Sequence, residues 1–171
     1  LVLARGGANI DSMEQALVRA VAYGVKNLFG QPTQRMDGAE YDEMMEMVDM
    51  YRGKFGFAAI AEPRLGEVGS YSTVINADKE AVAKAITAEA VKTAGFDSLD
   101  AAAEDGTAFV FMGHGTSHTA KVSYTQMQSQ MNALGYKNVF IGTVEGEPEE
   151  TACENVIEAV KAAGYTKVVL R

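Results

Sequence analysis

The sequence predicts an α/β protein with parallel sheets flanked by helices, arranged as two similar halves. Apolar runs of strand length alternate with amphipathic helical runs along the chain, which is typical of parallel sheets with helices on both faces. A helix–glycine–strand phrase recurs around Gly24, Gly135 and Gly164, which indicates repeated short connections and an internal duplication. The 171 residues, 47% hydrophobic and 22% charged, fit one globular domain or two small halves.

The first half is predicted to span residues 1–66 and begins with the apolar piece Leu1–Asn9 and a turn. Asp11 or Ser12 can then cap a helix, which Gly24 closes. Turn formers and apolar periodicity define the later elements. We expect a strand over 25–29, a loop over 30–38, a helix over 39–54 with its apolar positions on one face, and a strand over 57–61.

The second half is predicted to span residues 67–171. An aperiodic connector over 64–75 crosses the boundary between the halves, and the Asp/Ala-rich stretch 96–106 receives no predicted element. Glycines near the ends of the apolar periods close its helices. We expect helices over 76–93, 118–134 and 149–163, and strands over 107–112, 138–143 and 166–170.

Charge and composition exclude several classes of partner. The formal net charge is −8 and no cluster of Lys or Arg is interleaved with aromatics, so we expect no nucleic-acid partner. No apolar run approaches the ~20 residues of a membrane span, so we expect no membrane partner. The single cysteine, Cys153, cannot form an internal disulfide and is predicted to be buried or half-buried in a helix.

These features favour a cytoplasmic location, with the periplasm left open because the chain begins at Leu1. A homo-oligomer is also left open. The methionines at 44, 45, 47 and 50 are interpreted as core or as a subunit contact rather than as a thioether metal site.

Candidate functional residues follow the predicted strands. Ligands bind beyond the carboxyl ends of strands in open α/β sheets, and three loops lie there, over 31–40, 113–118 and 144–148. Their imidazoles and carboxylates suit a divalent ion such as Co²⁺, Ni²⁺, Fe²⁺ or Zn²⁺, and equally proton transfer. These side chains are His114, His118, Glu40, Asp37, Glu145 and Glu147.

Each candidate also has a structural interpretation. His114 lies between two glycines that let a ligand approach the backbone, which favours function, whereas His118 is predicted to be an exposed residue in the first turn of a helix. For Glu145 the functional and structural interpretations are equally favoured. Glu147 is interpreted as a solvated carboxylate at the start of a helix. Glu40 can simply be an N-terminal helix carboxylate.

Nucleotide binding is not expected. The segment Gly113–Thr116 is too short for a phosphate loop and lacks its lysine.

Three segments resemble the anaerobic cobalt chelatases. They are Phe109–Thr116, Val139–Gly146, and Gln31–Thr33 together with Gly38–Tyr41. These sirohydrochlorin cobaltochelatases are class II chelatases, as is ferrochelatase, and the resemblance covers nearly the whole chain. It implies two α/β halves enclosing a tetrapyrrole, and insertion of Co²⁺ into sirohydrochlorin without ATP, in cobalamin biosynthesis. Fe²⁺ and Ni²⁺ remain alternative metals.

The resemblance also implies residue roles. His114 and Glu145 become metal ligands. On chemical grounds a neutral His114 is expected to ligate the metal or to accept a proton, which makes it a candidate catalytic residue as well. Glu40 becomes a catalytic carboxylate that assists metal delivery or deprotonation. Arg35 and Arg64 are candidate cations for the carboxylates of the substrate.

Two departures from the family pattern matter. Gln34 stands where the family usually has histidine after Pro-Thr. Family members also have a strand and helix before position 1, and a strand and a loop with a second histidine after position 171, so both halves are expected to be truncated. The alternative is a non-catalytic haem or tetrapyrrole-binding protein with His114 as axial ligand, or an inactive fragment.

Overall fold

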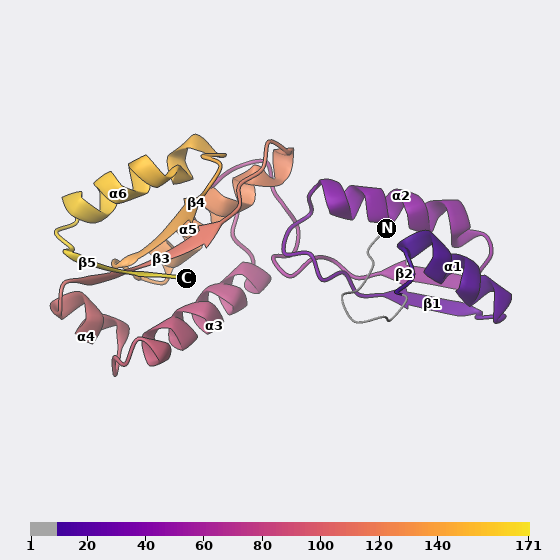
Figure 1. Ribbon diagram of the computed structural model, residues 1–171, viewed down its shortest axis with the longest axis horizontal. Coiled ribbons are helices and arrows are strands. Elements are labelled where there is room, and N and C mark those ends of the chain that lie inside the picture. Colours follow the sequence, from indigo (N-terminus) through magenta and orange to yellow (C-terminus); the bar gives the residue numbers. More distant parts are fainter. Residues whose placement is uncertain (1–9) are drawn as a thin grey trace. The chain divides into compact units, whose positions relative to one another are not determined.

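The computed structural model describes residues 10–171, so the predicted piece Leu1–Asn9 lies outside the described residues. The chain divides into two compact units, Leu1–Pro63 and Arg64–Arg171, each coloured by its place in the sequence in Figure 1. Both are α/β units with a small parallel sheet flanked by helices. No helix in the described part of the chain is long and apolar enough to cross a membrane.

The first unit contains two helices and two strands. They are α1 (Met13–Ala22), β1 (Asn27–Gly30), α2 (Ala39–Arg52) and β2 (Phe57–Ile60). The strands pair in parallel from Asn27 opposite Phe57 to Gly30 opposite Ile60. The predicted elements are confirmed, with ends displaced by one or two residues, and the buried side chains of Leu17 and Val48 hold the helices in place.

The second unit is built on a three-stranded parallel sheet of order β4-β3-β5. Helices lie on both faces of this sheet: α6 covers one face, and α3 and α4 lie along the other (Figure 1). Its elements are α3 (Ala77–Thr93), α4 (Leu99–Glu104), β3 (Thr107–Gly113), η1 (Thr119–Lys121), α5 (Val122–Ala133), β4 (Val139–Thr143), η2 (Glu149–Thr151), α6 (Cys153–Ala162) and β5 (Lys167–Leu170).

Strand β3 is the centre of this sheet and is buried on both faces. Ala108 and Val110 pack against Val156 on α6. Phe109 points to the opposite face, where its ring meets Phe96 edge-on at a centroid distance of 6.4 Å. A strand covered on both faces needs apolar side chains at successive positions, which explains the continuous apolar run in the sequence.

Three details differ from the sequence-based expectations. The unassigned stretch 96–106 contains α4, whose N-cap Ser98 accepts a hydrogen bond from the backbone of Ala101. The predicted helices from His118 and from Glu149 each begin with a 3₁₀ turn, η1 and η2, before the α-helix proper.

The predicted burial of Cys153 is wrong. The residue is exposed because it stands at the first position of α6, whereas the apolar stripe of that helix meets the sheet at Val156 and Val160.

The recurrent helix–glycine–strand phrase is a Schellman motif. Gly24, Gly135 and Gly164 have φ angles of +71°, +77° and +85°, which side chains rarely adopt. The next residue in each copy donates its N–H to a carbonyl five residues back, with Val25 to Ala20 at 3.1 Å as one case. This motif closes the helix and turns the chain toward the following strand.

The connector after Pro63 is fixed to the second unit by side-chain donors. The buried ammonium of Lys79 donates to the carbonyls of Leu65 (2.9 Å) and Glu67 (2.8 Å). The buried amide of Gln126 donates to the carbonyls of Gly69 and Tyr71, both at 3.0 Å. Irregular backbone that lies against a core needs such partners, so these two side chains hold the connector on α3 and α5.

Candidate metal centre

The site forms where β3 and β4 end. The two strands pair in parallel up to Gly113 opposite Thr143, and the ladder continues into both loops. Val144 donates its N–H to the carbonyl of Gly113 (3.0 Å), and Glu145 donates to the carbonyl of His114 (2.9 Å). Backbone hydrogen bonds therefore hold residues 114 and 145 side by side.

This pairing brings the imidazole of His114 to the carboxylate of Glu145. The Nε2 atom of His114 lies 3.0 Å from Oε1 of Glu145, and the side chains are 76% and 53% exposed. An imidazole nitrogen and a carboxylate oxygen at this distance can bind one divalent ion or share one proton. Within residues 10–171 no group of three or more His, Cys, Asp or Glu side chains could hold a metal ion, so the described chain offers a two-donor site.

The backbone beside His114 is tightly confined. Gly115 has a φ angle of +93°. A Cβ atom there would lie 3.1 Å from the carbonyl oxygen of Glu147 and 3.2 Å from the Cβ of Glu145. The glycine after His114 thus lets the two loops touch.

Tyr124, on the first turn of α5, also contacts this backbone. Its hydroxyl oxygen accepts the N–H of Gly115 at 3.1 Å. Its ring occupies the space beside Gly113, where an added Cβ would overlap Cε1 of the ring. No motif marked this tyrosine in the sequence, because its role depends on which face of α5 meets the loop.

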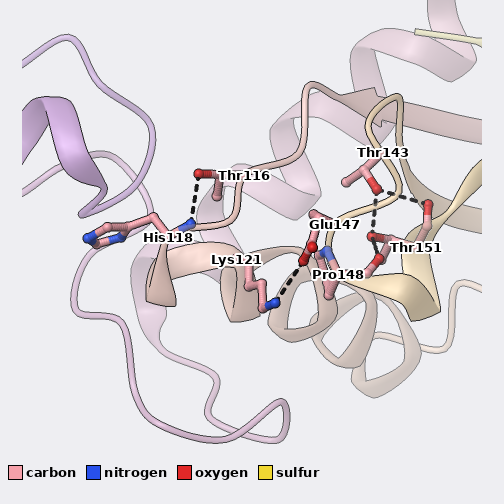
Figure 2. Close-up of polar contacts among 7 residues, drawn as sticks. All are labelled: Thr116, His118, Lys121, Thr143, Glu147, Pro148 and Thr151. Carbon is pink, nitrogen blue, oxygen red and sulfur yellow. Dashed lines mark hydrogen bonds and ion pairs between the residues drawn. The ribbon is translucent and has the colours of Figure 1, made fainter.

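Glu147 is ion-paired, and its side chain is 44% exposed. Its carboxylate accepts from the ammonium of Lys121 at 2.7 Å (Figure 2), so its charge is balanced within the protein. Its backbone carbonyl accepts the N–H of Thr116 at 3.4 Å, which joins the two loops a third time. The peptide from Glu147 to Pro148 is cis.

A hydroxyl pair secures the far side of the β4 loop. Thr143 and Thr151 are buried with their Oγ1 atoms 3.0 Å apart, and Thr151 also donates to the carbonyl of Pro148 at 2.9 Å (Figure 2). The loop that carries Glu145 is therefore closed back onto the end of its own strand.

His118 is the N-cap of η1. Its Nδ1 atom accepts the N–H of Ala120 at 3.1 Å, and its own N–H donates to Oγ1 of Thr116 at 3.2 Å (Figure 2). An Nδ1 atom that accepts is deprotonated, so a neutral His118 carries its proton on Nε2. The residue is half-buried rather than fully exposed, and its side chain caps the N-terminus of the helix.

Glu40 belongs to the first unit and lies exposed in the first turn of α2. The neighbouring Tyr41 anchors this helix, because its hydroxyl donates to the carbonyl of Ala61 at 3.4 Å. Burial raises the pKa of Tyr41, and the carboxylate of Asp37 raises it further, so its hydroxyl stays protonated. Among the predicted site residues, the side chains of His114 and Glu145 lie in contact in the second unit.

The fold and this pair define a parallel α/β protein with an imidazole–carboxylate site at the carboxyl edge of its second sheet. The chain belongs to the cobalt chelatase (CbiK) family, whose model matches residues 2–171. It is 26% identical over 166 residues to a sirohydrochlorin cobaltochelatase of Salmonella typhimurium strain LT2. That match covers 97% of this chain and 54% of the relative, so the chain spans about half the length of this curated protein.

Proposed function

We propose that this chain inserts Co²⁺ into sirohydrochlorin without ATP, with His114 and Glu145 as the protein ligands of the incoming ion. The observation that carries the proposal is the 3.0 Å separation of the two donor atoms at the carboxyl edge of the sheet. Membership in the cobalt chelatase family supports the metal, and the name of the Salmonella relative supports the tetrapyrrole.

The spacing of the two donors lets them reach one ion. Metal bonds to imidazole nitrogen and carboxylate oxygen are about 2.1 Å long, so donor atoms 3.0 Å apart can bind the same divalent ion. Fe²⁺ and Ni²⁺ compete for the same donors, because a nitrogen and oxygen set does not separate these metals by type.

Binding the ion changes the hydrogen bonding of His114. For Nε2 to donate to Glu145 it must carry the ring proton, whereas a metal takes the lone pair of a deprotonated Nε2. A neutral imidazole therefore moves its proton to Nδ1 on binding metal. Glu145 exchanges that hydrogen bond for a metal bond, and its negative charge offsets part of the charge of the dication as water leaves.

Insertion also requires removal of two pyrrole protons from the macrocycle. We assign proton acceptance and metal delivery to Glu40 and His114. A positioned carboxylate can act as a general base, and Glu40 is exposed at the start of α2. Arg35 and Arg64 are exposed as well, and we assign them to the carboxylates of the substrate. The proposal includes a cytoplasmic location, consistent with a chain whose single cysteine is unpaired.

The test is an anaerobic assay of Co²⁺ insertion into sirohydrochlorin, followed by the change in the visible spectrum of the macrocycle. The proposal expects turnover without added ATP, and loss of turnover in His114→Ala with an unchanged far-ultraviolet circular dichroism spectrum. Tight binding of unaltered sirohydrochlorin without turnover supports the non-catalytic tetrapyrrole-binding alternative and refutes the enzyme.

A further inference from the structure

We propose that Tyr124 is a positioning residue for the metal site, and that it acts by fixing the peptide on both sides of His114. This inference rests on the proposed function, because the site that it positions is the His114–Glu145 pair. Tyr124 touches neither of those side chains in the contacts that define the site, and acts through Gly113 and Gly115.

The side chain of His114 has little packing of its own to hold it. It is 76% exposed, and its polar contact is the carboxylate of Glu145. The backbone from Gly113 to Gly115 therefore sets the direction in which the imidazole projects from the protein surface. Two glycines have more conformational freedom than any other pair of residues, so this backbone needs external restraints.

The β4 loop restrains one side of this segment. The carbonyls of Gly113 and His114 accept from Val144 and Glu145, and a Cβ on Gly115 would lie only 3.1 Å from the carbonyl oxygen of Glu147. These contacts fix the carbonyl groups. They leave the N–H of Gly115 and the open face of Gly113 to be restrained by another element.

Tyr124 supplies both missing restraints from α5. Its hydroxyl oxygen accepts the N–H of Gly115 at 3.1 Å. Its Cζ and hydroxyl oxygen both lie 3.0 Å from the position that a Cβ on Gly113 would occupy, so the ring covers the open face of that residue. A half-buried tyrosine on a regular helix is more rigid than a loop. Its contacts with Gly113 and Gly115 therefore restrict the backbone that carries the imidazole of His114.

Tyr124→Phe tests the inference, since it keeps the ring over Gly113 and removes the acceptor for Gly115. The control is Tyr136→Phe, because Tyr136 is also half-buried but lies beyond the opposite end of α5, before β4. In hydrogen exchange followed by NMR, we expect the Gly115 amide to exchange about fivefold faster in Tyr124→Phe, the factor for losing one hydrogen bond of ordinary strength. The rate in Tyr136→Phe should equal that of the wild type.

A second measurement uses Co²⁺ alone as the probe, titrated anaerobically and followed by its visible absorption. Tyr124→Phe should bind Co²⁺ about tenfold more weakly, at the lower end of the effect of losing a group that orients a metal ligand, with an altered band shape. A purely structural role would leave both the affinity and the band shape of the bound ion as in the wild type.

The outcomes separate the two proposals. A wild-type chain that binds no Co²⁺, or a His114→Ala variant that binds it normally, overturns the metal site itself. A wild type that binds Co²⁺ together with a Tyr124→Phe variant of equal affinity and band shape overturns the role of Tyr124 alone. Equal weakening in Tyr124→Phe and Tyr136→Phe overturns it as well.

Discussion

The Nε2 atom of His114 and the Oε1 atom of Glu145 lie 3.0 Å apart on two loops whose backbones are themselves hydrogen-bonded. The separation follows from the parallel ladder of β3 and β4, which runs past the strand ends to the carbonyl of His114. Two exposed side chains therefore meet without being packed in a core.

Glu145→Gln should weaken Co²⁺ binding on the order of 100-fold, because the amide keeps the size of the side chain and loses its charge and metal affinity. The matched control is Glu147→Gln. Glu147 lies on the same loop, but its carboxylate is paired with Lys121, so Co²⁺ affinity should stay near the wild-type value. Anaerobic titration with Co²⁺ measures both, and equal affinities for the two variants would contradict the ligand assignment.

Glu40→Gln should lower kcat for insertion by roughly 10² to 10⁴, the usual contribution of a positioned acid or base. The affinity for Co²⁺ should not change, because Glu40 is not one of the two proposed metal ligands. Glu43→Gln is the control, since Glu43 is an exposed carboxylate on the same helix. A normal kcat in Glu40→Gln would remove this residue from the mechanism.

Gly115→Ala should destabilise the protein by more than Gly164→Ala does. Both glycines have positive φ angles, +93° and +85°, so each alanine costs about 1–2 kcal/mol of backbone strain. A Cβ at Gly164 meets no atom within 4 Å, whereas one at Gly115 presses on the carbonyl of Glu147. Thermal unfolding compares the two, and only Gly115→Ala should also weaken Co²⁺ binding; identical behaviour would argue against confinement at Gly115.

Lys79 should make stability depend on pH. Burial lowers the pKa of its ammonium below the ordinary 10.5, an effect that Asp78 and Glu67 only partly offset. Between that lowered pKa and pH 10.5 the unfolded chain binds more protons than the folded chain, so the free energy of unfolding rises with pH. Neutral Lys79 retains two N–H donors for its two carbonyl acceptors.

Urea unfolding across this pH range measures the effect of Lys79. Lys79→Met should remove the rise, whereas Lys92→Met, which changes an exposed lysine of the same helix, should keep it. A wild type and a Lys79→Met variant with parallel pH profiles would show that the ammonium is not desolvated.

Much of the fold was predictable because strand and helix periods are local properties. The apolar run that becomes β3 had to be covered on both faces, and the glycine that closes each helix needs a backbone that only glycine adopts easily. The stretch 96–106 was harder, because α4 has only six residues and depends on Ser98 as its cap rather than on an apolar period.

The contacts that position the site were not predictable in the same way. Sequence places histidine and glutamate after strands, but the neighbours of those loops depend on the orientation of α5. That helix begins with a 3₁₀ turn of three residues, and each such residue turns about 20° more than in an α-helix, so the helix face shifts by about 60°.

Buried polar side chains are the other feature that could not be predicted from the sequence. Gln126 is fully buried, although glutamine is usually exposed. Its amide binds two carbonyls of the connector, at Gly69 and Tyr71, which lie more than fifty residues away in the sequence. No local pattern in the sequence encodes a pairing between residues this far apart.

The role of His114 and Glu145 as metal ligands stays a prediction, which the Co²⁺ titrations test.

The continuation of the β3–β4 ladder into the loops has a consequence for how the site can change. Main-chain atoms, which every amino acid possesses, set the distance between positions 114 and 145. The side chains at these positions can therefore be exchanged without rebuilding the loops. If these two residues are the metal ligands that we propose, substitution at either position is expected to change the donor type, and with it the metal preference, while the backbone stays the same.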